Sequence, residues 1–168
     1  DDYFQLGLEC EIAVRLKSDL PLRAAFYEAA DMPAAVDSVM ASIEVVEHRF
    51  RDFRTASTPS LVADDFFSAG CVLGAPVRVD DLRDLSTLRG GFSVNGKRPE
   101  QAGSGAEILG HPLRALAWLA DQTARLGTPL RAGQIVSLGS VVKTRYPKAG
   151  ERIEARFTRL PAAVVEVI

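Results

Sequence analysis

Apolar and polar residues alternate from residue 6 to residue 16, and this pattern predicts a strand near the start of the chain. One face of that strand is expected to carry Leu8, Cys10, Ile12, Val14 and Leu16. The opposite face carries Glu9 and Glu11, together with Ala13 and Arg15. Because side chains two residues apart on a strand point the same way, the two glutamates are expected to lie side by side.

Further along the chain, short apolar runs alternate with turn residues. A helix is predicted over 33–42, and a better-defined helix over 111–126, which has Pro112 at its start and Gly127 just past its end. Asn95 and Gly96 predict a hairpin turn within 92–97. Further strands are predicted over 43–50, 70–73, 134–140, 152–158 and 163–168. The pattern indicates an α+β fold in which strands dominate and helices pack to one side.

The composition fits one domain over residues 1–168 with an ordinary core, since 47% of the residues are hydrophobic and 25% are charged. A net charge of -2 favours neither nucleic acid nor an anionic membrane as a partner. The two cysteines form no CxxC or Cys/His cluster, which favours the cytoplasm over an oxidising compartment. The chain begins with Asp1 rather than Met, so we expect a fragment or a chain whose N-terminal part is absent.

The three carboxylates that offer the clearest chemistry are Glu9, Glu11 and Glu44. An ExE pair on a strand is most often part of a solvated face, and Glu44 has the alternative of an ion pair with Arg15 or Arg49. However, Glu44 lies in an apolar run, where an ionised carboxylate needs a partner or a metal. Three carboxylates with few imidazoles suit Mg²⁺ or Mn²⁺ rather than zinc or copper.

Several other polar residues have both a structural and a functional interpretation. His111 opens the predicted helix, where it either supports the helix start or faces the site. His48 and Arg49 could both lie on the surface. The Gly139-Ser140 step follows a predicted strand, so its backbone N–H groups could hold a carboxylate or simply form a turn.

These motifs occur in an order that resembles the fumarylacetoacetate hydrolase superfamily, in particular the branch of 2-hydroxypenta-2,4-dienoate hydratases and 4-oxalocrotonate decarboxylases. The resemblance covers nearly the whole chain. The blocks that carry it are LECEIAVRLKSDLP (8–21), IEVVEHRFRDF (43–53), VADDFFSAGCVLG (62–74), VNGKRPEQAGSGAEILGHPLRALAWLA (94–120), LGTPLRAGQIVSLGS (126–140) and AGERIEARF (149–157).

The resemblance implies a mixed β-roll or sandwich with peripheral helices, and Mg²⁺ or Mn²⁺ at Glu9, Glu11 and Glu44. Ser140 and Asp64 are predicted to bind the substrate, a small 2-oxo acid of aromatic meta-cleavage catabolism. The third metal ligand is typically Asp in the hydrolases of this superfamily, so Glu44 favours the lyase branch. The same Lewis acid serves hydration and decarboxylation, so the three glutamates do not choose between these two reactions.

The chain also departs from the family pattern. The resemblance implies a catalytic lysine in a segment that precedes the ExE strand, and that segment is expected to lie outside the given sequence, so no catalytic acid or base is assigned. Glu47-His48-Arg49 stands where Asp-Ser-Arg is usual, 63–67 reads Ala-Asp-Asp-Phe-Phe instead of Ala-Asp-Asn-Ala-Ser, and Gln134 replaces an Asp. These changes leave two alternatives open, a non-catalytic or partner subunit and an acylpyruvate-type C–C hydrolase. The expected assembly is a homo-oligomer or a complex of hydratase and decarboxylase chains.

Overall fold

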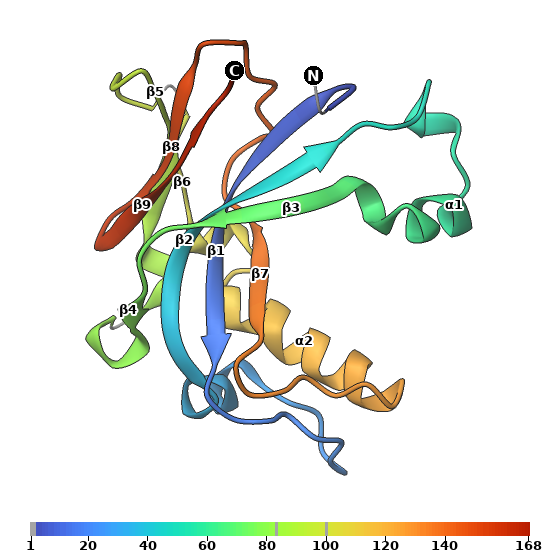
Figure 1. Cartoon of the computed structure of the whole chain (residues 1–168). Helices are drawn as coiled ribbons and strands as arrows, with labels where there is room; N and C mark the ends of the chain where they lie inside the picture. Colours follow the sequence, from blue (N-terminus) through green and yellow to red (C-terminus); the bar gives the residue numbers. More distant parts are fainter. Residues whose placement is uncertain (1–2, 83, 100) are drawn as a thin grey trace.

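Two antiparallel sheets form the frame of the molecule in a computed structural model that describes residues 3–82, 84–99 and 101–168. The larger sheet has the order β3-β2-β1-β7, with β4 paired to β2, and the smaller sheet has the order β6-β5-β8-β9 (Figure 1). The larger sheet consists of β1 (Leu6–Leu16), β2 (Val36–Glu47), β3 (Ser68–Leu73), β4 (Val77–Arg78) and β7 (Ile135–Ser140). The smaller sheet consists of β5 (Arg89–Val94), β6 (Gly103–Ser104), β8 (Arg152–Phe157) and β9 (Leu160–Glu166).

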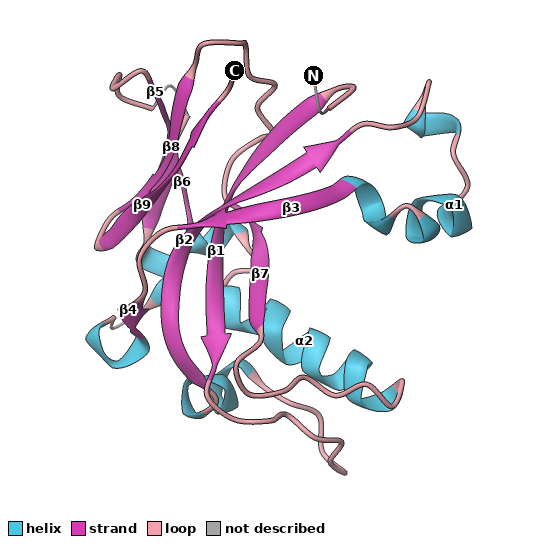
Figure 2. Cartoon of the chain, viewed as in Figure 1, coloured by secondary structure: helices cyan, strands magenta, loops and turns pink. Residues whose placement is uncertain are grey.

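Helices lie around the edges of these sheets, and strands dominate the fold (Figure 2). The α-helices are α1 (Thr58–Ala63) and α2 (Pro112–Arg125). In the described part of the chain, short 3₁₀ helices lie between the strands: η1 (Ala29–Ala34), η2 (Phe53–Thr55), η3 (Asp65–Phe67), η4 (Val79–Asp81), η5 (Leu85–Thr87) and η6 (Gly105–Glu107). The strand-dominated α+β fold predicted from the sequence is confirmed.

Strand β1 has the predicted bounds and the predicted inward face. All five apolar residues of that face are at most 1% exposed, so the alternation of the sequence translates directly into burial. The strand lies between β2 and β7 and pairs antiparallel with both. Its central position explains why even Ala13, on the glutamate face, is fully buried.

The helix predicted over 33–42 is wrong for most of its length. Only η1 is helical there, and the chain enters β2 at Val36. Strand β2 pairs with β1 along its whole length, from Val36 opposite Leu16 to Glu47 opposite Leu6. Long-range pairing and the burial of Val36 and Val39 therefore outweigh the helical spacing of the apolar residues.

Helix α2 and most of the other predicted strands are confirmed to within a few residues. His111 is the N-cap of α2, and its Nδ1 atom accepts a hydrogen bond from the backbone N–H of Leu113 at 3.1 Å. Of the two interpretations of His111, the structure favours the one in which this residue stabilises the start of the helix. The Asn95-Gly96 turn is present, with φ angles of 49° and 76°, but β5 before it pairs with β6 and β8 rather than with the residues that follow the turn.

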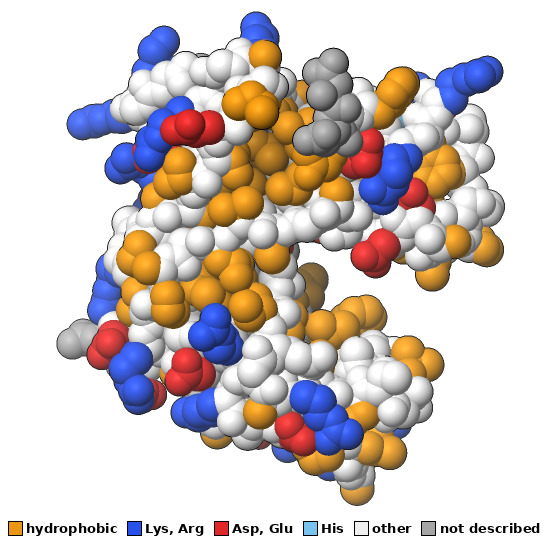
Figure 3. All heavy atoms as spheres, viewed as in Figure 1, with side chains coloured by type: hydrophobic (Ala, Val, Ile, Leu, Met, Phe, Trp, Pro, Cys, Tyr) orange, Lys and Arg blue, Asp and Glu red, His pale blue; other side chains and the backbone are white. Residues whose placement is uncertain are grey.

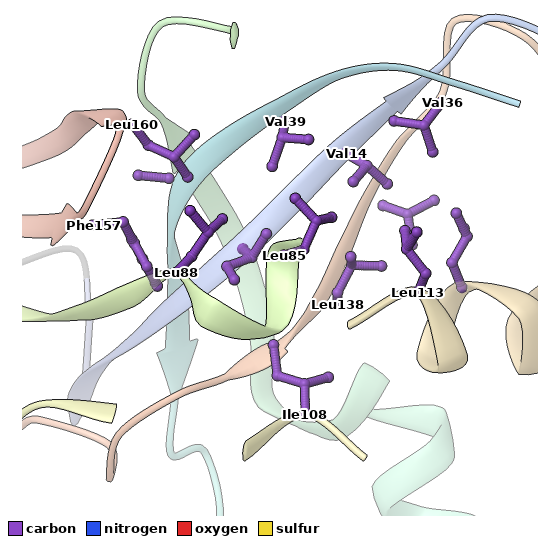
Figure 4. Packing of buried hydrophobic residues seen from close by; sticks show 14 of the residues in the cluster. Val14, Val36, Val39, Leu85, Leu88, Ile108, Leu113, Leu138, Phe157 and Leu160 are labelled. Carbon is purple, nitrogen blue, oxygen red and sulfur yellow. The ribbon is translucent and has the colours of Figure 1, made fainter. Parts of the chain in front are cut away.

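The hydrophobic core lies between the two sheets and continues under α2. Figure 4 shows Val14 and Leu138 from the larger sheet near Leu113 of α2, and Phe157 and Leu160 from the smaller sheet. Because the core covers one face of β1 and β2, their other face is left to carry polar side chains. The surface is hollowed between the arm that carries α1 and the helix α2 (Figure 3).

Candidate metal centre

Glu9, Glu11 and Glu44 come together on one face of the larger sheet. Glu9 and Glu44 are direct partners in the β1–β2 pairing, and Glu11 lies two residues along β1 on the same face. One carboxylate oxygen from each residue lies within 4.8 Å of the others. The sequence predicted this cluster, and the pairing of β1 with β2 provides the geometry.

Burial and mutual repulsion make this cluster unfavourable when all three groups are charged. Glu11 is only 3% exposed, and burial, with added repulsion from Glu44 and Glu9, raises its pKa to about 7. The pKa of Glu44 is also raised, first by burial and then by the charge of Glu9. Raised pKa values of this origin mean that a positive charge between the three groups would relieve the strain.

Hydrogen bonds hold two of the carboxylates in place. Strand β7 is irregular opposite Glu11, and there the Ser137 hydroxyl and the Gly139 backbone N–H both donate to Glu11 Oε2. Gly139 has a φ of 129°, which suits glycine and aims its N–H at the glutamate. Thr144 donates its hydroxyl to Glu9 Oε1 at 2.6 Å. Such supporting contacts orient carboxylates that bind a metal.

Within residues 3–82, 84–99 and 101–168, no lysine or arginine forms an ion pair with Glu9, Glu11 or Glu44. Arg49, the suggested partner of Glu44, instead contacts Glu47 and Asp64. The ion-pair alternative for Glu44 is therefore not supported. Three carboxylates without a protein cation fit a hard divalent ion such as Mg²⁺.

The two predicted substrate-binding residues both have hydrogen-bond partners within the protein. Ser140 lies opposite Glu11 in the sheet, and its hydroxyl donates to the Val142 carbonyl at 2.8 Å. Asp64 accepts from Arg49 Nε at 2.8 Å, and this contact is the main reason that its pKa lies below the usual range. Both residues are engaged within the protein, and their role in substrate binding stays a prediction.

A cavity of about 230 Å³ opens directly beside Glu9 and Glu44. It is also lined by Gln5, Val46, His48, Phe53, Phe66, Phe67, Thr144 and Tyr146. His48 is half-buried in this wall, although the sequence suggested a surface position. The lining residues come from segments far apart in the chain, so no periodicity in the sequence marks Phe53, Thr144 or Tyr146 as part of a site.

Three carboxylates whose oxygens converge beside a small cavity are the kind of all-oxygen site that suits a hard divalent cation. The family model for the Fumarylacetoacetate (FAA) hydrolase C-terminal domain matches residues 3–168. The chain therefore belongs to the fumarylacetoacetate hydrolase family.

The curated relatives of this chain include hydratases and a decarboxylase. It is 42% identical over 138 residues to a 2-keto-4-pentenoate hydratase of Burkholderia vietnamiensis, and this match covers 82% of this chain and 51% of the relative. It is 33% identical over 153 residues to a 4-oxalocrotonate decarboxylase of Pseudomonas putida, which covers 91% of this chain and 56% of the relative. The chain thus spans about half the length of these curated relatives.

A solved structure agrees with the fold. The 4-oxalocrotonate decarboxylase of Pseudomonas putida G7, complexed with magnesium and adipate, superimposes with a TM-score of 0.88 at 29% identity. The match covers 99% of this chain and 62% of that structure's chain. A search of the described helices for one long and apolar enough to cross a membrane found none.

Proposed function

We propose that this chain carries the metal centre of a divalent-metal-dependent lyase that acts on 2-oxo or 2-hydroxy dienoic acids of aromatic meta-cleavage catabolism, by hydration or decarboxylation. The observation that carries the proposal is the cluster of Glu9, Glu11 and Glu44, whose oxygens converge to within 4.8 Å. The names of the relatives, hydratases and a decarboxylase, support the reaction class. Glu44 supports it too, because the hydrolase branch typically has Asp at this position.

When bound, the cation supplies Lewis-acid stabilisation of negative charge that develops on a substrate oxygen. Mg²⁺ is the first candidate, and Mn²⁺ is the second because it shares the preference for oxygen ligands. The glutamates hold the cation only when deprotonated, so Ser137 and Gly139 favour binding by stabilising the charged form of Glu11. Thr144 donates a hydrogen bond to Glu9 and thereby fixes the rotamer of this glutamate.

The cavity beside the glutamates offers room for the rest of a small acid. Its wall combines the rings of His48, Phe53, Phe66 and Phe67 with the polar side chains of Gln5 and Thr144. A substrate whose carboxylate end is bound through a cation held by Glu9 and Glu44 would extend its tail along these rings, where water is displaced.

Calorimetric titration with Mg²⁺ and Mn²⁺, followed by an assay of 2-hydroxypentadienoate and 4-oxalocrotonate turnover, tests this function. We expect saturable binding of the cation and turnover of one of the two acids only when the metal is present. Binding without turnover of either acid would favour the non-catalytic or partner-subunit alternative. Cleavage of an acylpyruvate would favour the C–C hydrolase, and no metal binding at all would overturn the proposal.

We also propose a cytoplasmic location and assembly into a homo-oligomer or a hydratase–decarboxylase complex. The location is supported by Cys10 and Cys71, which are both free thiols. Sedimentation of the purified protein, alone and with a hydratase or decarboxylase relative, would test the assembly.

A further inference from the structure

The wall of the cavity that faces Glu9 and Glu44 is a packed group of aromatic rings. The His48 ring lies 4.9 Å from the Phe53 ring and 5.8 Å from the Phe67 ring, and Phe53 and Phe67 are 5.7 Å apart. Phe50 packs edge-on against Phe67 from behind, at 5.9 Å. These distances are those of aromatic pairs in contact, so the rings support each other and form a defined surface.

An unusual backbone conformation presents two of these rings. Asp65, Phe66 and Phe67 have φ angles of 58°, 46° and 72°, a left-handed conformation that residues with side chains rarely adopt. Three such residues in a row persist only when their surroundings hold them. The sequence 63–67 is also where the chain departs from the family pattern, so the side chains that this turn presents are particular to this chain.

Arg49 and Asp64 hold this turn in place. Asp64 accepts a hydrogen bond from the Phe67 backbone N–H at 3.1 Å and thereby caps the turn. Arg49 donates hydrogen bonds to the carboxylate and to the backbone carbonyl oxygen of Asp64, each at 2.8 Å. Asp64 is therefore placed to position the aromatic wall, through contacts that leave its carboxylate bonded within the protein.

The charges around the cavity oppose a second anionic group. Among the described residues that line it, Glu9 and Glu44 are acidic and none is Lys or Arg. The Nδ1 atom of His48 is buried and has no hydrogen-bond partner among the residues that the structure describes. A carboxylate on the substrate tail would lose its water against the rings and would find no cation there.

We propose that the wall of His48, Phe66 and Phe67 restricts the metal cavity to 2-oxo acids with an uncharged, apolar tail and discriminates against a second carboxylate. This inference rests on the proposed function and narrows its substrate class. It favours a monocarboxylic acid, as in the name of the hydratase relative, over a dicarboxylic acid such as the adipate held by the decarboxylase structure.

A neighbouring cavity of about 550 Å³ offers the competing arrangement. Lys97, Lys143 and Arg145 line it, and it shares Thr144 and Tyr146 with the metal cavity. A dicarboxylate long enough to pass these two shared residues could place its far end among the lysines. A comparison of two acids of equal length, one with an apolar tail and one with a carboxylate tail, therefore shows whether the tail lies against the aromatic wall or among the lysines.

Calorimetric titration of the Mg²⁺-loaded protein with three acids tests the proposal. Oxalate measures chelation at the metal alone, while 2-oxohexanoate and 2-oxoadipate have the same chain length and differ in the terminal carboxylate. We expect oxalate to bind, and 2-oxohexanoate to bind at least about tenfold more tightly than 2-oxoadipate. If oxalate fails to bind, the proposed function fails; if it binds but 2-oxoadipate is equal or preferred, only the tail selectivity is overturned.

A charge introduced into the wall gives a second, independent readout. Phe66 is 54% exposed, so Phe66→Lys should fold, and we expect it to shift the ratio of 2-oxoadipate affinity to 2-oxohexanoate affinity by about tenfold towards 2-oxoadipate. Leu22→Lys is the control, because Leu22 is 60% exposed and lies outside the cavity. An equal change in both variants would show that general electrostatics, rather than the wall, sets the preference, and would overturn the proposal.

Discussion

Glu9 and Glu44 face each other as direct partners across the antiparallel pairing of β1 and β2. Two like charges in this arrangement destabilise a sheet, and Glu11 adds a third carboxylate on the same face. The protein keeps this arrangement between two central strands, where Ala13 and Ser42 beside the glutamates are buried. A cation bound among the three carboxylates would offset the repulsion between them.

Loss of the third carboxylate should abolish metal binding. For Glu44→Gln we expect the affinity for Mg²⁺ to fall by at least about 100-fold, since even the loss of residues that only support a ligand costs about 10- to 100-fold. Calorimetric titration measures the change, and turnover should fall with it. Glu166→Gln is the control, because Glu166 is an exposed carboxylate on β9. Similar Mg²⁺ affinities for the two variants would remove Glu44 from the site.

The stability of the metal-free protein should fall as the pH rises. The pKa of Glu11 is about 7 in the folded state, above its ordinary value of 4.5, because of burial first and then the charges of Glu44 and Glu9. The folded protein therefore holds this proton more tightly than the unfolded chain, and the stabilisation is present below the ordinary pKa and lost as the pH rises through about 7. Thermal unfolding should show a lower Tm at about pH 8 than at about pH 5.

Mg²⁺ should reverse this trend, because it competes with the proton for Glu11. We expect added Mg²⁺ to raise the Tm more at about pH 8 than at about pH 5. Glu11→Gln should show a smaller decline of the metal-free Tm over the same range, and the part that remains is expected from Glu44, whose pKa is also raised. A decline in Glu11→Gln as large as that of the wild type would show that Glu11 does not contribute to the pH dependence.

Removal of the hydroxyls that support the glutamates should weaken the metal site without unfolding the protein. Ser137→Ala removes a donor to Glu11, and Thr144→Val removes the donor to Glu9. We expect each variant to bind Mg²⁺ about 10- to 100-fold more weakly, with a cooperative unfolding transition retained. Ser86→Ala serves as a control, since this hydroxyl bonds to Asp84, outside the metal cavity. Unchanged affinity in both test variants would show that the carboxylates need no such support.

The packing of α2 should contribute strongly to global stability. Leu116 is fully buried in the core, whereas Leu126 at the end of the same helix is 79% exposed. We expect Leu116→Ala to lower the free energy of unfolding by about 3 kcal/mol, because it leaves a cavity. The same change at Leu126 should cost no more than about 0.5 kcal/mol. Urea unfolding of the two variants gives the comparison, and equal losses would show that α2 is not packed on the core as described.

The sequence alone determined the parts that depend on local order. Alternation from residue 6 to residue 16 placed β1, and Pro112 and Gly127 bounded α2, because these features depend on neighbouring residues. The ExE pair and Glu44 were visible as candidates, and the family resemblance joined them into one cluster. It failed at residues 36–42, where apolar spacing fits either a helix or a strand. There the partner strand β1, distant in sequence, decides the conformation.

Only the tertiary structure decided what surrounds the glutamates. Ser137 and Thr144 reach them because β7 and the segment after it return to β1, more than 120 residues along the chain. His48 becomes part of the cavity wall, and Asp64 is bound by Arg49, because a strained turn at 65–67 folds back over β2. Such contacts join residues that are far apart in the sequence, so no periodicity or spacing along the chain encodes them, whereas the identity of the three glutamates was already legible there.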